Sequence, residues 1–182
     1  MQDLQRLLAV TGITLLAGCG GPAPVSKSNP ANAVDPYAVQ VMAPGEANCF
    51  ATTAEDGQAV AAATNQMRAR RGLQPVRPNA TLSRAAAAHA CDMARRGRMT
   101  HIGSTTTGPA QRVKALGYRP MVTAENIAAG PFTRTRVLHE WNISQGHRAN
   151  ILIPQMREVG IGRAIGPDGK TTFWAAVYSA PR

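Results

Sequence analysis

The sequence predicts an α+β fold in which helices pack on a small antiparallel sheet. Helix-like patterns occupy most of the chain after residue 54, and two β-rich segments joined by a tight turn close it. Helices therefore precede the hairpin instead of alternating regularly with strands. This order is typical of α+β proteins and argues against a parallel α/β fold.

The first helix is expected over residues 54–71. Thr52 and Glu55 have the spacing of a capping box at its start. Gly72 follows its last residue, where a left-handed glycine commonly ends a helix. Val60, Ala63 and Met67 form its apolar stripe.

The second helix is expected over residues 82–96, between a polar cap at Asn79 or Thr81 and the stop at Gly97. Residues spaced by three or four positions share one face of a helix. Cys91 points nearly opposite to that face. The shared face comprises Leu82, Ala86, His89 and Met93.

Two further helices follow. A short one has Pro109 in its first turn and Val113 and Leu116 directed inward. A longer one is expected over residues 134–145, with Gly146 as its stop. The apolar side of the longer helix comprises Val137, Leu138 and Trp141, and Trp141 is expected in the core.

The strands are concentrated at the end of the chain. Residues 158–165 show partial alternation, and residues 171–179 are rich in aromatic and β-branched side chains. Gly166-Pro167-Asp168-Gly169 between them is a hairpin signal. Residues 124–128 are expected to add a third strand.

The N-terminus has the features of an export signal. Residues 7–18 form an apolar run that is too short to span a bilayer but suits the core of a signal peptide. Leu16-Ala17-Gly18-Cys19 resembles a bacterial lipobox, in which Cys19 receives the lipid. The alternative is an ordinary secretory signal with an incidental cysteine.

The chain therefore divides into three parts. Residues 1–18 are expected to be a lipoprotein signal peptide, 19–47 a flexible tether rich in small residues and proline, and 48–182 the folded domain. Gly20 after Cys19 is compatible with sorting to the outer membrane. We expect an exported, membrane-anchored lipoprotein, located in the periplasm, at the outer membrane or at the cell surface.

The chain is strongly basic, with a formal net charge of +10 and a pI near 10.8. Such charge can neutralise nucleic acid, but an export signal argues against that partner. Anionic lipid head groups or cell-wall polymers are better candidates, and a merely solubilising surface is the alternative. The arginines cluster at Arg68, Arg70, Arg71 and Arg77, and again at Arg95, Arg96 and Arg98.

Cys49 and Cys91 remain after Cys19. In an exported chain such a pair is most simply a disulfide, and two unpaired thiols are the alternative. Because Cys91 lies on the outer side of its helix, the bridge would clamp an N-terminal segment that passes over the outside of the domain.

Several segments, read in order, resemble the CAP superfamily of cysteine-rich secretory and pathogenesis-related proteins. The resemblance covers about residues 55–180 and implies a three-layer α-β-α sandwich. It rests on the joint order and spacing of the segments. These include Asn65-Gln66-Met67-Arg68, Met99-Thr100-His101, Ala124-Glu125-Asn126-Ile127-Ala128, Trp141-Asn142-Ile143-Ser144-Gln145-Gly146-His147-Arg148-Ala149-Asn150, Val159-Gly160-Ile161-Gly162 and Phe173-Trp174-Ala175-Ala176-Val177-Tyr178.

The resemblance implies a cleft lined by two histidines and two glutamates. By position these are His101, His147 and Glu125, whereas Ser144 replaces the second glutamate. Two imidazoles can hold zinc or a similar divalent cation, but they fall short of the ligand number of tight sites. The alternative is a His-Glu pair that only stabilises loops through hydrogen bonding.

Other polar residues are expected outside this cleft. His89 is interpreted as a helix-face residue and His139 as a surface residue. Glu140 is expected to face solvent, and Ser144 to cap a helix end or bond within its loop. Arg148 and Asn150 are expected to hold the loop backbone.

The sequence thus predicts an extracytoplasmic binding module for lipid, cell-wall polymer or protein, with a weak metal site. One alternative is a hydrolase acting on envelope material, either metal-dependent or serine-type with Ser144, His147 and Glu125 as nucleophile, base and orienting group. The chain lacks a Gly-x-Ser-x-Gly elbow, which disfavours the serine-type mechanism. The third possibility is a purely structural envelope lipoprotein.

Overall fold

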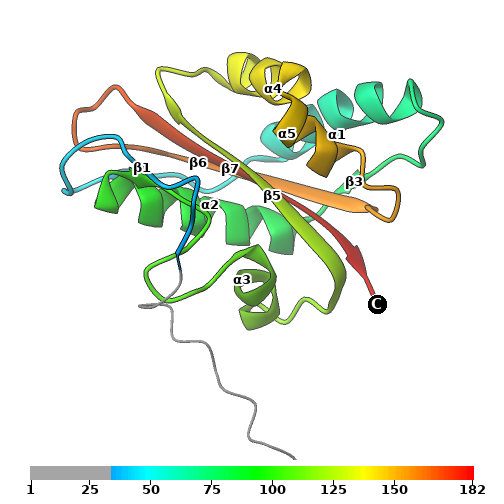
Figure 1. Ribbon diagram of the computed structural model, residues 1–182, viewed down its shortest axis with the longest axis horizontal. Helices are drawn as coiled ribbons and strands as arrows, with labels where there is room; N and C mark the ends of the chain where they lie inside the picture. Colours follow the sequence, from blue (N-terminus) through cyan, green and yellow to red (C-terminus); the bar gives the residue numbers. More distant parts are fainter. Residues whose placement is uncertain (1–33) are drawn as a thin grey trace, which may run out of the picture.

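Residues 34–182 are described by a computed structural model. The predicted signal peptide, Cys19 and the first part of the predicted tether lie outside this range. Helices cover both faces of a central sheet, which confirms the predicted three-layer sandwich (Figure 1). One layer contains α1 (Ala54–Ala69), α4 (Arg134–Ile143) and α5 (Gln145–Ile151), and the other contains α2 (Ala80–Arg96) and α3 (Pro109–Ala115).

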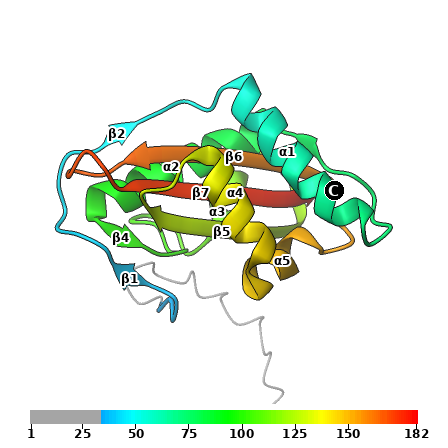
Figure 2. The same ribbon diagram turned by 90° about the horizontal axis from the view of Figure 1, so that it is seen from above.

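The central sheet has five strands, and its principal order is β2-β6-β7-β5, with all three pairings antiparallel (Figure 2). A fifth strand, β3, pairs with β6 in parallel. A separate two-stranded ribbon joins β1 to β4. The bounds are β1 Val39–Gln40, β2 Asn48–Cys49, β3 Arg77–Pro78, β4 Arg98–Met99, β5 Pro120–Gly130, β6 Glu158–Ile165 and β7 Thr172–Pro181.

The sheet is buried on both faces, as the alternation along β7 shows. Phe173, Ala175 and Val177 belong to the core on the α2 side. Trp174 and Tyr178 belong to the core on the α1 and α4 side. Because neighbouring residues of a strand point to opposite faces, a strand covered on both sides is apolar throughout.

Two glycines let α2 approach β6 closely. A Cβ on Gly160 would lie 2.1 Å from the backbone nitrogen of Ser83, and one on Gly162 would lie 2.1 Å from that of Ala87. Only glycine leaves room for such contact. The Gly-x-Gly pattern in β6 and the small residues of α2 are therefore two halves of one packing arrangement.

The ends of α2 confirm the predicted signals. The side chain of Asn79 accepts hydrogen bonds from the backbone of Thr81 and Leu82, and Gly97 has a φ of 61°. The capping box of α1 was predicted one residue too early. Thr53 and Asp56 form it, because the hydroxyl of Thr52 donates instead to the carbonyl of Ile161 in β6.

The predicted single helix over residues 134–145 is wrong. Ser144 adopts an extended conformation, with ψ at 127°, and separates α4 from a second short helix. Gly146 therefore lies inside α5 rather than at a helix stop. Leu116, predicted to point inward, is 42% exposed because α3 ends at Ala115.

The neighbouring arginines in the sequence suggested that Arg68 belongs to a solvated basic cluster, but the structure shows that it does not. It is fully buried, and its guanidinium donates to the carbonyls of Ile151, Ile153 and Met156. These carbonyls lie at and beyond the end of α5. A single buried arginine thus satisfies backbone groups that a helix end leaves without partners.

The last part of the predicted flexible tether packs against the domain. Val39 and Gln40 pair with β4, and the backbone nitrogen of Val41 donates to the carbonyl of Gly97. Residues 38–45 thus run alongside the C-terminal end of α2, which short-range sequence patterns did not indicate.

The predicted disulfide is confirmed. Cys49 in β2 is bonded to Cys91 in α2; the two residues have a sequence separation of 42 and a Cα–Cα distance of 5.3 Å. Cys91 lies on the outer side of α2, as its position opposite Leu82 indicated. The bond fixes the entering segment of chain across the outside of the helix.

Candidate functional site

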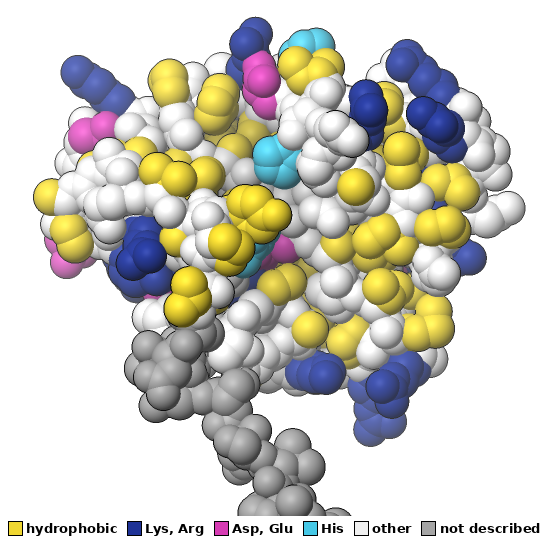
Figure 3. All heavy atoms as spheres, in the orientation of Figure 1, with side chains coloured by type: hydrophobic (Ala, Val, Ile, Leu, Met, Phe, Trp, Pro, Cys, Tyr) yellow, Lys and Arg dark blue, Asp and Glu magenta, His cyan; other side chains and the backbone are white. Residues whose placement is uncertain are grey.

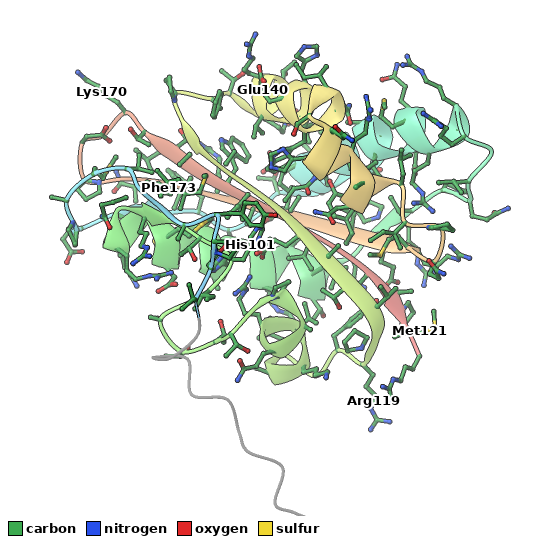
Figure 4. The ribbon with its side chains drawn as sticks, in the orientation of Figure 1. His101, Arg119, Met121, Glu140, Lys170 and Phe173 are labelled. Atoms are coloured by element: carbon green, nitrogen blue, oxygen red, sulfur yellow. A yellow bond between two sulfur atoms is a disulfide. The ribbon has the colours of Figure 1, made fainter. Side chains whose placement is uncertain are left out.

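The four predicted cleft residues line one groove along the free edge of β5. Its volume is about 870 Å³. His101 follows β4, Glu125 lies in β5, Ser144 separates α4 from α5, and His147 lies in α5. The structure therefore brings together side chains that are far apart in sequence. Figure 4 shows His101 beside the segment that leads into β1.

The remaining walls of the groove are mainly apolar. The segment entering β1 contributes Tyr37, β1 itself contributes Val39, and the edge of β5 contributes Ile127. Phe132, between β5 and α4, and Trp141 in α4 complete this lining. Figure 3 shows histidine and hydrophobic side chains next to one another on this face. A few polar groups in a mainly apolar hollow are typical of small-molecule sites.

Glu125 is the buried hub of the polar part. Its Oε1 lies 2.9 Å from Nδ1 of His101 and 3.6 Å from Nε2 of His89, and its Oε2 accepts from Arg112 at 2.5 Å. Burial alone would raise the pKa of Glu125. The proximity of the His89 ring and the positive charge of Arg112, together with the hydrogen bonds from His101 and Arg112, instead hold this pKa below its usual value.

The pairing with Glu125 orients His101. An ionised carboxylate accepts hydrogen bonds, so Nδ1 of His101 carries the proton and donates it. In a neutral ring with this tautomer, Nε2 is the unprotonated nitrogen and is available as an acceptor or ligand. The His101 side chain is 33% exposed, so it can meet a molecule in the groove.

His89 is a member of this network that the sequence reasoning missed. It was interpreted as a helix-face residue, and it does lie on the buried face of α2, with 1% of its surface exposed. Its Nε2 lies 2.8 Å from the carbonyl of Thr100, while its Nδ1 is buried without a hydrogen-bond partner. Burial lowers the pKa of His89 to about 4, so the ring is neutral at pH 7.

A further residue missed by the sequence analysis is Asp35. Its carboxylate accepts hydrogen bonds from the hydroxyl of Thr100 and the backbone nitrogen of His101. Burial opposes the effect, but these bonds hold the pKa of Asp35 below its usual value. The entering segment of chain is thus fastened directly to the residue that faces the groove.

The α5 side of the groove is held by amides. Asn150 was predicted to hold the backbone of its loop, but it lies in α5 and donates to the carbonyl of Glu125 and the side chain of Asn126 in β5. The indole of Trp141, which is buried as predicted, donates to the carbonyl of Ile127. These bonds occupy carbonyls on the free edge of β5 and leave less of that edge open to another strand.

His147 and Ser144 line the groove, and the carbonyl of His147 accepts a hydrogen bond from the side-chain amide of Asn126. Burial lowers the pKa of His147, and the nearby His101 lowers it further. Its Nδ1 is buried without a hydrogen-bond partner. Ser144 caps through its backbone, since its nitrogen donates to the carbonyl of Glu140, but its side chain makes no capping bond.

Two other residues, His139 and Glu140, were predicted to face solvent, and the structure confirms this only for the first. His139 is exposed, as expected. Glu140 does not simply face solvent: its side chain is 31% exposed, pairs with Arg136 and lines the groove. The carboxylate of Glu140 therefore lies at the rim of the groove, on α4 (Figure 4).

Comparison with known proteins identifies the family. Residues 61–178 match the model of the CAP family, described as the cysteine-rich secretory protein family. The chain belongs to the CAP family. A relative in Bacillus subtilis, the uncharacterized protein YkwD, is 36% identical over 99 residues, which are 54% of this chain and 38% of the relative. This chain therefore matches well under half of that protein's length.

Two solved structures share the fold. An outer surface protein from Borrelia burgdorferi has a TM-score of 0.62 at 21% identity, over 72% of this chain and 96% of that one. An extracellular protein with an SCP domain from Bacillus anthracis has a TM-score of 0.61 at 25% identity, over 69% of this chain and 40% of that one. Within residues 34–182, the helices are all too short or too polar to cross a membrane.

The CAP domain of this chain offers a metal ion two imidazoles at most. Both oxygens of Glu125 are already engaged by side chains of the network. No cluster of three or more histidine, cysteine or acidic residues suited to a metal occurs in the described part of the chain. The residues present therefore do not fit a tight zinc site, which needs three or four protein ligands.

Proposed function

We propose that this CAP-domain protein is an exported, lipid-anchored binding module whose groove takes up an amphipathic lipid of the cell envelope. The observation that carries the proposal is the groove of about 870 Å³ along β5. Its size is within the range of about 300–1,000 Å³ that is common for small-ligand sites. Its walls combine apolar side chains with His101 and His147 as polar groups.

The lining suits an apolar chain with a polar head. Tyr37, Val39 and Phe132 supply apolar surface for the chain, and burial of such surface is the main source of affinity for a lipid tail. His101 and Ser144 supply hydrogen-bonding groups for the head.

The serine-hydrolase alternative has less support. A catalytic histidine needs a carboxylate that accepts from its Nδ1 and orients the ring. In the proposed triad this carboxylate would be Glu125, but Glu125 is bonded to His101 and Arg112. His147 has no partner on Nδ1 among the described residues. Binding is therefore the better-supported function.

Titration with a fluorescent C18 fatty acid tests lipid uptake. Gly146 lines the groove, and a Cβ added there meets nothing within 4 Å, so Gly146→Phe adds a ring at the groove without disturbing the core. Gly108→Phe is the matched control, because Gly108 is equally open and lies before α3. We expect Gly146→Phe to weaken probe binding at least tenfold and Gly108→Phe to leave it unchanged. Equal binding by all three proteins would refute uptake in this groove.

Lipid anchoring is tested separately at Cys19. In the proposed lipoprotein, acylation of this thiol holds the mature chain at the membrane. Exchanging residues 1–19 for a secretory signal that is cleaved without acylation removes both the thiol and the apolar run, so it should move the protein from the membrane fraction to the soluble fraction of cells. An unchanged membrane fraction that also resists washing with salt would contradict the anchor.

A further inference from the structure

We propose that residues 34–41 form a membrane-docking strip that rests on an anionic bilayer surface and brings the mouth of the groove to the lipid. Docking by this strip depends on the proposed export of the protein, but it requires neither acylation nor uptake of lipid into the groove. The occupant of the strip is the lipid surface itself.

The first support is a concentration of exposed apolar side chains. Of the seven large hydrophobic side chains that are exposed within residues 34–182, four lie in this short segment. Tyr37 is 72% exposed and Val39 is 50% exposed. Clustered apolar side chains on a surface mark an interaction site, whereas isolated ones need no explanation. The strip comprises Val34, Tyr37, Val39 and Val41.

The strip is held in this exposed position by its backbone. Val39 and Gln40 pair with Met99 and Arg98. The side-chain amide of Gln40 donates to the carbonyls of Arg96 and Gly97. Val39 is thus presented by a paired ribbon, Val41 is held by the bond from its nitrogen to Gly97, and Asp35 fastens the preceding residues to the domain.

The charges beside the strip favour an anionic partner. Arg98 lies opposite Gln40 in the ribbon, and Arg95 at the end of α2 is also exposed. Neither pairs with a carboxylate among the described residues. The strip's own acid, Asp35, is turned inward to Thr100 and His101. Figure 3 shows Lys and Arg side chains gathered beside hydrophobic ones on this face.

This combination matches a lipid interface better than a protein partner. Tyrosine is favoured at the boundary between lipid and water because its ring is apolar and its hydroxyl is polar. Arginine near a surface of anionic lipid is attracted by its negative potential. The chain carries +10 in all, and the strip begins 15 positions after Cys19, the proposed point of membrane attachment (34 minus 19).

The strip also borders the groove. Tyr37 and Val39 belong to both, since they line the groove and remain exposed at its mouth. A domain resting on this strip would hold the groove open toward the bilayer. A lipid could then pass from the membrane to the groove without crossing bulk water.

Vesicle co-sedimentation of the unlipidated protein tests the strip. Residues 20–182, the proposed mature chain without its lipid-bearing cysteine, are mixed with vesicles of phosphatidylcholine alone or with about 30% phosphatidylglycerol. We expect binding to the anionic vesicles, and about a tenfold loss on adding Tyr37→Ser and Val39→Ser. The matched control carries Leu116→Ser and Met121→Ser, which are exposed apolar residues elsewhere. Met121 lies far from His101, near the start of β5 (Figure 4).

A charge pair and a groove variant complete the test. Arg95→Gln with Arg98→Gln should remove the preference for anionic vesicles, whereas Arg70→Gln with Arg119→Gln should keep it. Gly146→Phe, which obstructs the groove, should bind vesicles as the parent does. The docking strip is refuted if the Tyr37→Ser, Val39→Ser protein sediments with vesicles like the Leu116→Ser, Met121→Ser control. It is also refuted if Gly146→Phe loses as much vesicle binding as the Tyr37→Ser, Val39→Ser protein. Loss of fatty-acid uptake with intact vesicle binding would refute only the proposed function.

Discussion

Nδ1 of His101 lies 2.9 Å from Oε1 of Glu125, and this bond joins the groove to the buried interior of the domain. One partner is partly exposed and the other is buried. On its far side Glu125 contacts Arg112 and His89. Changes in the interior can therefore alter both the stability of the domain and the orientation of a ring in the groove.

Replacing Arg112 should be costly. Arg112→Met removes the guanidinium that faces the buried carboxylate of Glu125, and breaking a buried ion pair from one side costs about 3–5 kcal/mol. We expect the free energy of unfolding, measured with urea, to fall by about this amount. Adding Glu125→Gln should recover part of the loss, because the unpaired charge is then gone. Purely additive losses would contradict a direct interaction.

His89 should make stability depend on pH. Its pKa is about 4 in the folded protein and about 6.5 when exposed, so the unfolded chain binds more protons between these values. The contribution of His89 to the free energy of unfolding is then fully present above pH 6.5. It is lost as the pH drops toward 4, by about 3 kcal/mol in all. Urea unfolding between pH 4 and 7.5 should show this fall, and His89→Gln should flatten it. An equal slope in both proteins would assign the effect to other groups.

Local sequence signals predicted the elements whose ends depend on local chemistry. Asn79 and Gly97 bound α2 because a side-chain cap and a left-handed glycine act within one turn of helix. The strand over residues 158–165 and the hairpin that follows it were predicted for the same reason. The capping box of α1 was misplaced because Thr52 makes a bond to β6, which no local pattern reveals.

The convergence of His101, Glu125 and His147 came from the family resemblance and not from spacing. Their companions were harder to predict. Strands of two residues, such as β1 and β4, are too short to show any alternation, so the position of Asp35 over His101 could not be foreseen. A signal did exist for His89, since an ionisable group on an apolar helix face needs a buried partner. That partner lies 36 positions away in Glu125 (125 minus 89).

The disulfide should contribute strongly to stability. Closing a loop of 42 residues lowers the conformational entropy of the unfolded chain. In the chain-entropy model this stabilises the folded protein by about 4 kcal/mol. Cys49→Ser with Cys91→Ser should lower the free energy of unfolding by about that amount. Intact-mass analysis is the accompanying control, because two thiols should appear only after reduction of the native protein. A double variant as stable as the parent would show that the bond constrains little.

We expect the residue at position 144 to limit how tightly the groove could hold a metal. We expect weak, exchangeable zinc binding through His101 and His147, because two ligands fall short of a closed coordination shell. Ser144 lines the same groove and stands where many CAP domains have a glutamate. Ser144→Glu should therefore add a third ligand and raise the affinity for zinc at least tenfold in calorimetry. His101→Ala with His147→Ala should abolish the heat in both backgrounds. Zinc binding that survives this double replacement would place the ion elsewhere, and unchanged affinity in Ser144→Glu would show that this position cannot reach it.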